Sequence, residues 1–203
     1  MRTRTFILLC ITFIIQFAGV FPLQAGHYYY KQISLKDGLP STVRCILTDE
    51  QGFVWIGTRS GLGRYDGHEL KKYIHQADHP HSLPHNLINQ ITEDKQNNIW
   101  ILTDKGVACY QRQSDDFFIP TDEKGNNILA YSTCLMKDGV LFGSQNKVYF
   151  YNYQNSSLRL LQTFNQEPNF NITLLSLWNA HTLLCCSRWQ GLCLLYTSPS
   201  PRD

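Results

Sequence analysis

Short apolar and β-branched runs alternate with polar turns along most of the chain. In the first unit the runs lie at 43–48, 53–58 and 62–65, and a polar turn that ends at Gly52 separates the first two. An Asp-Gly pair then favours a hairpin into a fourth run at 68–75. Apolar stripes with the helical period are not visible, so the pattern predicts short antiparallel strands.

The same unit returns 45 positions later with equivalent residues in one register. A fainter third copy around Leu141 follows at an offset of 86, and a fourth begins at Leu184, near an offset of 129. Four strands in each repeat of 41 to 45 residues are typical of a β-propeller blade. The positions that keep the 45-residue register are Ile46, Asp49, Trp55, Ile56, Thr58, Gly61, Leu62 and Tyr65, which recur as Ile91, Asp94, Trp100, Ile101, Thr103, Gly106, Val107 and Tyr110.

We therefore predict an all-β fold, namely an incomplete β-propeller of about four four-stranded blades over residues 26–192. Blades must stack because a single blade cannot bury both of its faces alone. The sequence fixes neither the total number of blades nor whether these residues fold alone. The predicted repeats lie near 43–75, 88–119, 131–162 and 172–192.

The recurring residues have structural rather than catalytic chemistry. Trp55 lies on an inner strand, where its ring is expected to fill the wedge between neighbouring blades. Asp49 precedes a tight turn, where its carboxylate can accept backbone N–H bonds, and Gly52 permits a positive φ there. Thr58 favours a strand and can hydrogen-bond across it. We predict no catalytic residue.

The first 25 residues have the pattern of a secretory signal peptide. Arg2 and Arg4 give a positive start, an apolar run covers 6–20, and Ala25 offers a small residue for cleavage. The alternative is a signal anchor that stays in the membrane, for which the run is short of the roughly 20 residues of a span. We expect the chain from about His27 onward to lie outside the cytoplasm.

Composition narrows the range of partners. Aromatic residues make up 13% of the chain, which favours strands, and the net charge is only +2 with no block of Lys or Arg. That balance argues against a nucleic-acid partner.

The seven cysteines show no C-x-x-C spacing. A disulfide is permitted outside the cytoplasm, but buried free thiols are the favoured interpretation and no pair is assigned.

Four histidines form the strongest candidate for a metal site: His75, His79, His81 and His85. Imidazoles at this spacing could bind Zn²⁺ or Cu²⁺. The segment also contains two prolines and sits where a linker between blades belongs. We therefore interpret it as a solvent-facing loop and predict neither a metal site nor a cofactor.

Paired carboxylates at Asp115-Asp116 and Asp122-Glu123 are the candidates for acid–base chemistry. A glycosidase would need two carboxylates facing each other across a cleft, whereas acidic residues are common in turns. We interpret both pairs as turn residues.

Aromatic side chains at 28–30, Trp178 and Trp189 could stack on sugar rings. Packing in cores and at sheet edges is the more frequent role of such residues. The sequence therefore identifies no ligand-binding residue.

The first unit resembles the two-component regulator propeller repeat. The residues that carry the resemblance are Asp49, Gly52, Trp55, Ile56, Gly57, Thr58, Gly61, Leu62 and Tyr65, followed in the second unit by Asp94, Trp100, Ile101, Thr103, Gly106 and Tyr110. A Gly-Leu-Pro-Ser segment at 38–41 resembles the lead-in to a first blade, and Ser82-Leu83-Pro84 resembles an inter-blade linker. Leu102 replaces the expected Gly, and Leu141 replaces the expected Trp.

This resemblance implies the periplasmic sensor region of a Bacteroidetes hybrid histidine kinase. Many such sensors detect oligosaccharides and switch on the matching utilisation genes. The resemblance therefore implies, for the full-length protein, an oligosaccharide ligand, a homodimer and an inner-membrane anchor in a downstream segment. The fragment itself is then not an enzyme, although its full-length parent is a kinase. The alternatives are a secreted propeller enzyme acting on polysaccharide and a propeller that only mediates protein contacts.

The last eleven residues, 193–203, break the strand pattern and end in a Pro/Ser-rich sequence. They resemble the translation of a transposase adapter used in sequencing libraries, which is excluded from fold reasoning. The alternative is a natural Pro/Ser tail. On the adapter interpretation we expect the reading frame of the gene to continue downstream.

Overall fold

The computed structural model describes residues 30–39, 41–164, 170–179, 182–188 and 191–196. The chain divides into two compact units, Met1–Gln32 and Ile33–Asp203. The predicted signal peptide lies outside the described residues, as do Tyr28, Tyr29 and Trp189. Within the part of the chain that is described, no helix is long and apolar enough to cross a bilayer.

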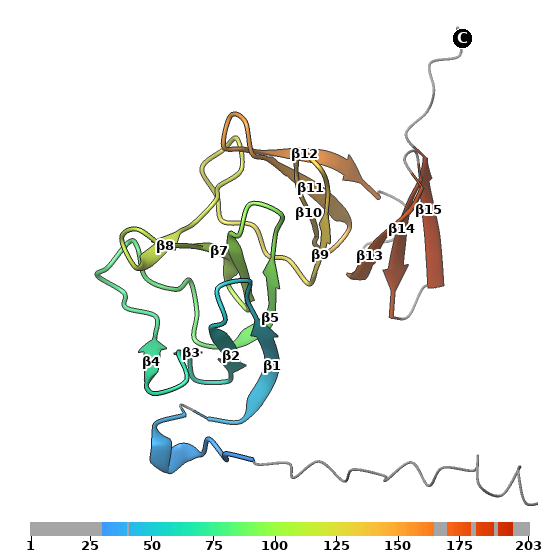
Figure 1. The fold of residues 1–203 in the computed structure, drawn as a ribbon. Coiled ribbons are helices and arrows are strands. Elements are labelled where there is room, and N and C mark those ends of the chain that lie inside the picture. The colour runs from blue at the N-terminus through green and yellow to red at the C-terminus, as the bar shows by residue number, and fades with distance from the viewer. Residues whose placement is uncertain (1–29, 40, 165–169, 180–181, 189–190, 197–203) are drawn as a thin grey trace, which may run out of the picture. The chain divides into compact units, whose positions relative to one another are not determined.

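The second unit is built from antiparallel sheets in which sequential strands are neighbours (Figure 1). A short 3-10 helix, η1 (Leu35–Asp37), precedes them. Blade 1 consists of β1 (Val43–Thr48), β2 (Val54–Thr58), β3 (Leu62–Tyr65) and β4 (Leu70–Tyr73), and blade 2 of β5 (Ile88–Glu93), β6 (Ile99–Thr103), β7 (Gly106–Gln111) and β8 (Asp116–Phe118). Blade 3 consists of β9 (Ser132–Leu135), β10 (Gly139–Gly143), β11 (Lys147–Asn152) and β12 (Ser157–Thr163), and blade 4 of β13 (Ile172–Asn179), β14 (Thr182–Ser187) and β15 (Gly191–Tyr196).

The predicted all-β fold of about four blades is confirmed, with three strands rather than four described in blade 4. One local expectation was wrong. The strand pattern does not break after Leu192, because β15 continues to Tyr196 and pairs with β14 along its whole length. Residues 197–203 lie outside the described residues, and the origin of that end stays a prediction.

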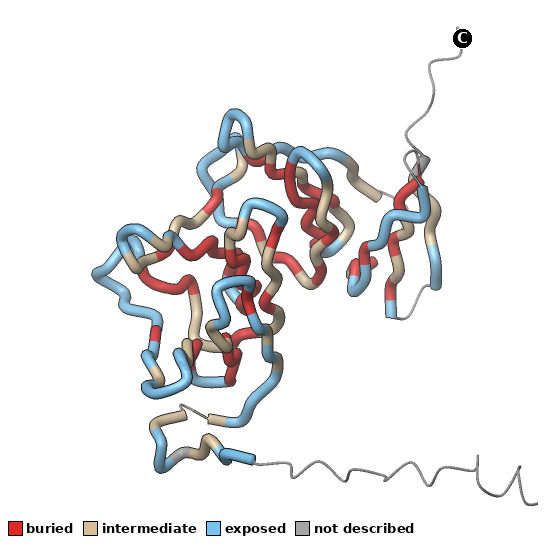
Figure 2. Tube along the Cα trace, in the orientation of Figure 1, coloured by how far each residue is buried: buried red, intermediate tan, exposed pale blue. Residues whose placement is uncertain are grey.

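Apolar residues cluster between each blade and the next, and we call each such interface a seam. Figure 2 shows the buried residues in red along the strands. The first seam, between blades 1 and 2, centres on Trp55, which is fully buried. The second seam, between blades 2 and 3, centres on Trp100, which is 1% exposed. The third seam joins blades 3 and 4 around Leu141 and Ile172. Each sheet therefore buries apolar surface mainly by packing on its neighbour.

The first two seams share one aromatic arrangement. The rings of Trp55 and Tyr110 pack edge to face, with their centroids 4.8 Å apart and an interplanar angle of 64°. The rings of Trp100 and Tyr151 do the same, with a centroid distance of 4.9 Å and an angle of 65°. Edge-to-face geometry places the positive edge of one ring on the negative face of the other. The sequence repeat thus reproduces a contact between blades as well as the strands within them.

The face of blade 1 that carries Ile46 is exposed, because no blade precedes blade 1 within the described residues. Ile46 on β1 is 66% exposed, whereas Ile91, its equivalent on β5, is 8% exposed and belongs to the first-seam cluster. The two residues have the same chemistry and the same strand position. The difference arises because blade 1 covers Ile91.

Gly57 permits close approach of the two blades in the first seam. A Cβ at this position would lie 2.7 Å from Cγ2 of Ile88, below any ordinary contact. The corresponding position in blade 2 is Leu102, which is fully buried in the second-seam cluster together with Ala130. The second seam therefore accommodates Leu102 in place of the expected Gly, and it also contains the small side chain of Ala130.

We predict that Trp55→Ala lowers the free energy of unfolding by about 3–5 kcal/mol, because it removes the central side chain of a closed seam. Trp100→Ala should cost a similar amount. Chemical denaturation of the purified protein measures both, with the half-exposed Ile74→Ala as a control that changes stability by less than about 1 kcal/mol. An unchanged midpoint for Trp55→Ala would show that the seam does not support the fold.

Candidate functional site

The buried carboxylate of Asp49 organises the β1–β2 turn. Its Oδ1 accepts hydrogen bonds from the backbone N–H groups of Gln51 (3.1 Å) and Phe53 (2.9 Å), and its Oδ2 accepts one from Nε1 of Trp55 (2.9 Å). Burial raises the pKa of Asp49, but the hydrogen bonds from Trp55 and Arg112 outweigh burial and hold it below its ordinary value. One ionised carboxylate therefore joins the turn to the Trp of the seam.

The same arrangement recurs in the β5–β6 turn around Asp94. Its Oδ1 accepts from the backbone N–H groups of Gln96 (2.8 Å) and Asn98 (3.0 Å), and its Oδ2 from Nε1 of Trp100 (2.7 Å). The sequence predicted the turn bonds of the Asp but not the bond from the indole. The constant spacing of six residues between Asp and Trp was the available signal.

The remaining repeat residues lie in the β2–β3 and β6–β7 hairpins and on their strands, except Gly52, which lies in the β1–β2 turn. Oγ1 of Thr58 donates to the carbonyl of Gly61 (2.7 Å), and Oγ1 of Thr103 donates to that of Gly106 (2.8 Å). Gly52 and Gly61 have positive φ values of 86° and 131°. The other members lie on strands: Ile56, Gly57, Leu62, Tyr65, Ile101 and Tyr110.

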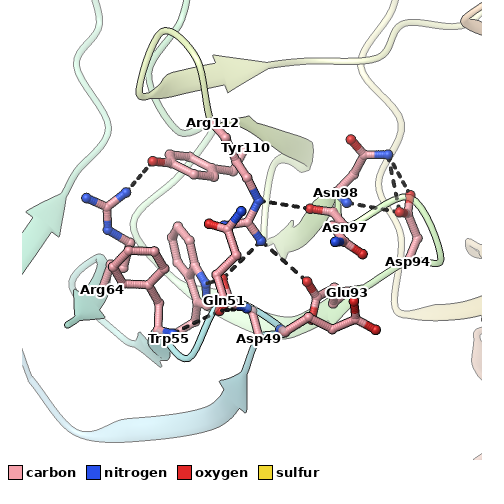
Figure 3. Close-up of polar contacts among 12 residues, drawn as sticks. Asp49, Gln51, Trp55, Arg64, Glu93, Asp94, Asn97, Asn98, Tyr110 and Arg112 are labelled. Carbon is pink, nitrogen blue, oxygen red and sulfur yellow. Dashed lines mark hydrogen bonds and ion pairs between the residues drawn. The ribbon is translucent and has the colours of Figure 1, made fainter. Parts of the chain in front are cut away.

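Arg112, in the β7–β8 turn, ties blade 2 to blade 1 (Figure 3). Its Nη2 lies 3.0 Å from Oδ2 of Asp49 and 3.3 Å from Oε1 of Glu93. The other guanidinium nitrogens donate to the Gln51 side chain (2.8 Å) and the Asn97 carbonyl (3.1 Å). Sequence reasoning missed Arg112 because neither neighbouring blade carries Arg at its position.

Asp115 and Arg64 form a second charged contact across the first seam. Oδ1 of Asp115 lies 3.2 Å from Nη1 of Arg64 and accepts from the hydroxyls of Tyr73 and Tyr110 at 2.6 Å each. Lys71 contacts the other carboxylate oxygen, and Arg64 also bonds to the Tyr110 hydroxyl. Burial raises the pKa of Asp115, but the hydrogen bonds from Lys71, Tyr110 and Tyr73 bring it down to about 2.

The second seam carries different residues at these same positions. Cys109 pairs with Trp100 across β6–β7 as Arg64 pairs with Trp55 across β2–β3. In the β11–β12 turn, Tyr153 stands where Arg112 stands in the β7–β8 turn, and Ser156 stands where Asp115 stands. Ser156 and Asp115 also share a positive φ, 51° and 57°. The charged side chains of the first seam are therefore exchanged for small or neutral ones.

A pocket of about 620 Å³ occupies the second seam at this point. The exchanged residues Cys109, Tyr153 and Ser156 all line it, together with Trp100 and Tyr151. Arg112 lines its other side. The sequence analysis identified no residue of this pocket as a ligand contact. The pocket forms where the second seam has smaller or uncharged side chains than the first, and this difference is visible only once the blades are packed.

The polar clusters considered in the sequence do not form this pocket. Nδ1 of His75 lies 2.6 Å from the carbonyl of Leu83, and Nδ1 of His85 accepts from the backbone N–H of Leu87. Within the described ranges, no three His, Cys, Asp or Glu side chains are grouped as metal ligands. Asp115 lies in a turn, as predicted, but Asp116 begins strand β8, so that part of the prediction was wrong. Trp178 on β13 is 64% exposed.

Comparison with known proteins gives the same fold and repeat. The two-component regulator propeller model matches residues 37–60 and 82–105. Histidine kinase P4 of Formosa agariphila is 36% identical over 61 residues, which are 30% of this chain and 4% of that protein. The chain thus spans a small part of that relative.

Two solved structures share the fold over most of the chain. The extracellular domain of BT3049 from B. thetaiotaomicron, described as part of a hybrid two-component system, superposes with a TM-score of 0.68 at 19% identity. It covers 82% of this chain and 25% of that domain. The corresponding domain of BT4673 from the same organism gives a TM-score of 0.59 at 24% identity, covering 76% of this chain and 20% of that domain.

The stacked antiparallel sheets and the apolar seams between them, two of which centre on a Trp, define a β-propeller protein. Within that class, the two matched segments contain the Asp–Trp turns of blades 1 and 2. Residues 37–60 and 82–105, in blades 1 and 2, are accordingly similar to two-component regulator propeller repeats.

We predict that Asp115→Asn destabilises the fold by about 1 kcal/mol at pH 7, a value reduced by solvent screening because the side chain is 32% exposed. The folded pKa of about 2 lies below the roughly 3.9 of an unfolded chain. The ionised form therefore stabilises the fold above about pH 4, and this stabilisation is lost as pH falls towards 2. Denaturation at several pH values should show the wild-type advantage shrinking in that window.

We predict that Arg112→Met lowers the free energy of unfolding by about 2–3 kcal/mol, because the Asp49 side chain, which is 0% exposed, loses its cation. Arg112→Lys should cost less but not restore stability, since one ammonium group cannot reproduce the guanidinium fork. A double-mutant cycle with Asp49→Asn isolates the pair, and the exposed Arg59→Met serves as the control. A coupling energy near zero would refute the contact between blades.

Proposed function

We propose that this chain is the ligand-sensing propeller of a hybrid sensor histidine kinase and lies outside the cytoplasm. The observation that carries the proposal is the pair of regulator propeller repeats. The fold shared with extracellular domains of hybrid two-component systems supports it. On this proposal residues 1–25 export the chain, and a downstream segment anchors it in the inner membrane.

The charged groups of the first seam favour a binding role over catalysis. Glycoside hydrolysis requires a carboxylic acid that keeps its proton near neutral pH, together with a second carboxylate. The pKa of Asp115 is about 2, and hydrogen bonds from Tyr73, Tyr110 and Lys71 surround its carboxylate. Burial raises the pKa of Glu93, but its carboxylate is bound by Arg112, which it shares with Asp49, and by the backbone N–H of Glu50 (2.9 Å). These carboxylates hold blades together.

The ligand of the proposed sensor is an oligosaccharide, and its signal regulates transcription of the genes for using that carbohydrate. On this proposal the protein is a homodimer whose subunits can adopt two arrangements, and ligand binding favours one of them. The size of the response then depends on the difference in affinity between those arrangements. A shift from 1:99 to 99:1 needs a difference of roughly 10⁴-fold.

We predict that oligosaccharides supplied outside the cytoplasm change the phosphorylation of the full-length protein in intact cells. Phosphate-affinity electrophoresis measures the response, and deletion of residues 2–25 should abolish it by keeping the propeller in the cytoplasm. Chromatography of the medium distinguishes the alternative enzyme. Cleavage of the oligosaccharide by the purified protein without any phosphorylation response would contradict the sensor.

A further inference from the structure

The pocket of the second seam exists because three positions break the pattern of the first. In the first seam, Arg64 lies beside the Trp, with its guanidinium carbon 5.8 Å from the Trp55 ring centroid and 4.9 Å from that of Phe53. Its equivalent beside Trp100 is Cys109, whose side chain ends at a thiol. A long side chain that fills one seam is thus absent from the matching place in the next.

The partner of that arginine is exchanged as well. Asp115, which faces Arg64 across the first seam, becomes Ser156 in the second. The position of Arg112, which contacts Asp49 in the first seam, is occupied by Tyr153 in the second. Burial, and after it the Asp94 carboxylate, raise the pKa of Tyr153. The exchanges preserve the turns while removing every charge they carried. At these three positions the second seam is therefore open and uncharged, whereas the first is filled and charged.

The polar groups around the pocket can bind an uncharged ligand. Side-chain amides come from Gln51, Gln96, Asn97 and Gln113, and each amide both donates and accepts hydrogen bonds. The Tyr153 hydroxyl is buried and has no hydrogen-bond partner of good geometry among the described residues, although the Asp94 carboxylate lies near enough to raise its pKa after the larger effect of burial. Such a group is costly to leave unsatisfied, so a ligand hydroxyl or a water is its expected partner.

The charges near the pocket disfavour an anionic ligand. Among the lining residues the cation is Arg112, and its guanidinium is already within 3.3 Å of two carboxylates, those of Asp49 and Glu93. An anion would have to compete with both. A neutral ligand with several hydroxyl groups meets the amides without that competition, and a volume of about 620 Å³ suits a ligand of one or two sugar rings.

We propose that the pocket between blades 2 and 3 is a binding site for a neutral, hydroxyl-rich ligand of disaccharide size, held by the amides of the turns. The inference rests on the proposed sensing function and adds to it a location and a charge preference. The ligand contacts both blades, with Trp100 among the lining residues and the β1–β2, β5–β6, β7–β8 and β11–β12 turns around the site.

Calorimetric titration of the full-length protein tests the proposal with maltose, cellobiose and lactose as neutral probes and digalacturonate as the acidic one. We expect at least one neutral disaccharide to bind, and to bind at least about tenfold more tightly than digalacturonate. Incorporation of 5-fluorotryptophan provides a local readout. The ¹⁹F signal of Trp100 should shift on binding, whereas that of Trp55, its equivalent in the filled seam, should not.

The decisive variant introduces the charged residues of the first seam at the equivalent positions of the second seam. Cys109→Arg combined with Ser156→Asp should fill the pocket and lower the affinity at least about tenfold. The matched control, Arg64→Cys with Asp115→Ser, makes the reverse change in the first seam and should alter affinity by less than about threefold. If the filled variant does not fold, the two tryptophan signals of the wild-type protein still decide the question.

The outcomes separate this proposal from the sensor itself. Disaccharide binding that leaves Trp100 unshifted, or that survives in the folded filled variant, places the site elsewhere and overturns the pocket alone. Tighter binding of digalacturonate, or no binding of any neutral probe, overturns the pocket's ligand class. The phosphorylation response of intact cells tests the sensing function independently of these results.

Discussion

The hydrogen bond from a buried indole to a turn carboxylate sets the geometry on which the blades depend. Asp49 fixes its own turn through two backbone bonds and fixes Trp55 through a third. The Trp ring then meets Tyr110 of the next blade edge to face. Because the carboxylate is inaccessible to water, each donor that it loses leaves a charge without compensation. Strand, turn and seam are therefore stabilised together.

That shared geometry leaves other seam positions free to vary. The Trp–Tyr contact is nearly identical in the first two seams, although the residues beside it change from Arg64 and Asp115 to Cys109 and Ser156. The substitutions alter charge and volume without moving the strands, since the pairing registers are conserved. A propeller can in this way keep its architecture while a single seam becomes a pocket.

The fold could be predicted from the sequence because its determinants are local and repeated. Trp55 and Trp100, their Asp partners and the turn glycines recur at a fixed spacing, so the blades follow from period and turn chemistry. The pocket could not be predicted in that way. It depends on which side chains face each other across a seam, and Arg112 and Tyr153 acquire their roles only once two blades pack. The end of the last strand was missed because β15 is selected by pairing with β14 rather than by its own sequence pattern.

A ligand in the second seam would act on the same contact that holds the blades together. Trp100 belongs both to the pocket and to the buried cluster that joins blades 2 and 3. Binding free energy gained there adds directly to the stability of the folded state, because the unfolded chain has no such pocket. At a ligand concentration of about 100 times the dissociation constant the gain is roughly 2.7 kcal/mol, comparable with the loss expected for Arg112→Met. A seam therefore gives a propeller a way to convert ligand occupancy into stability of the folded state.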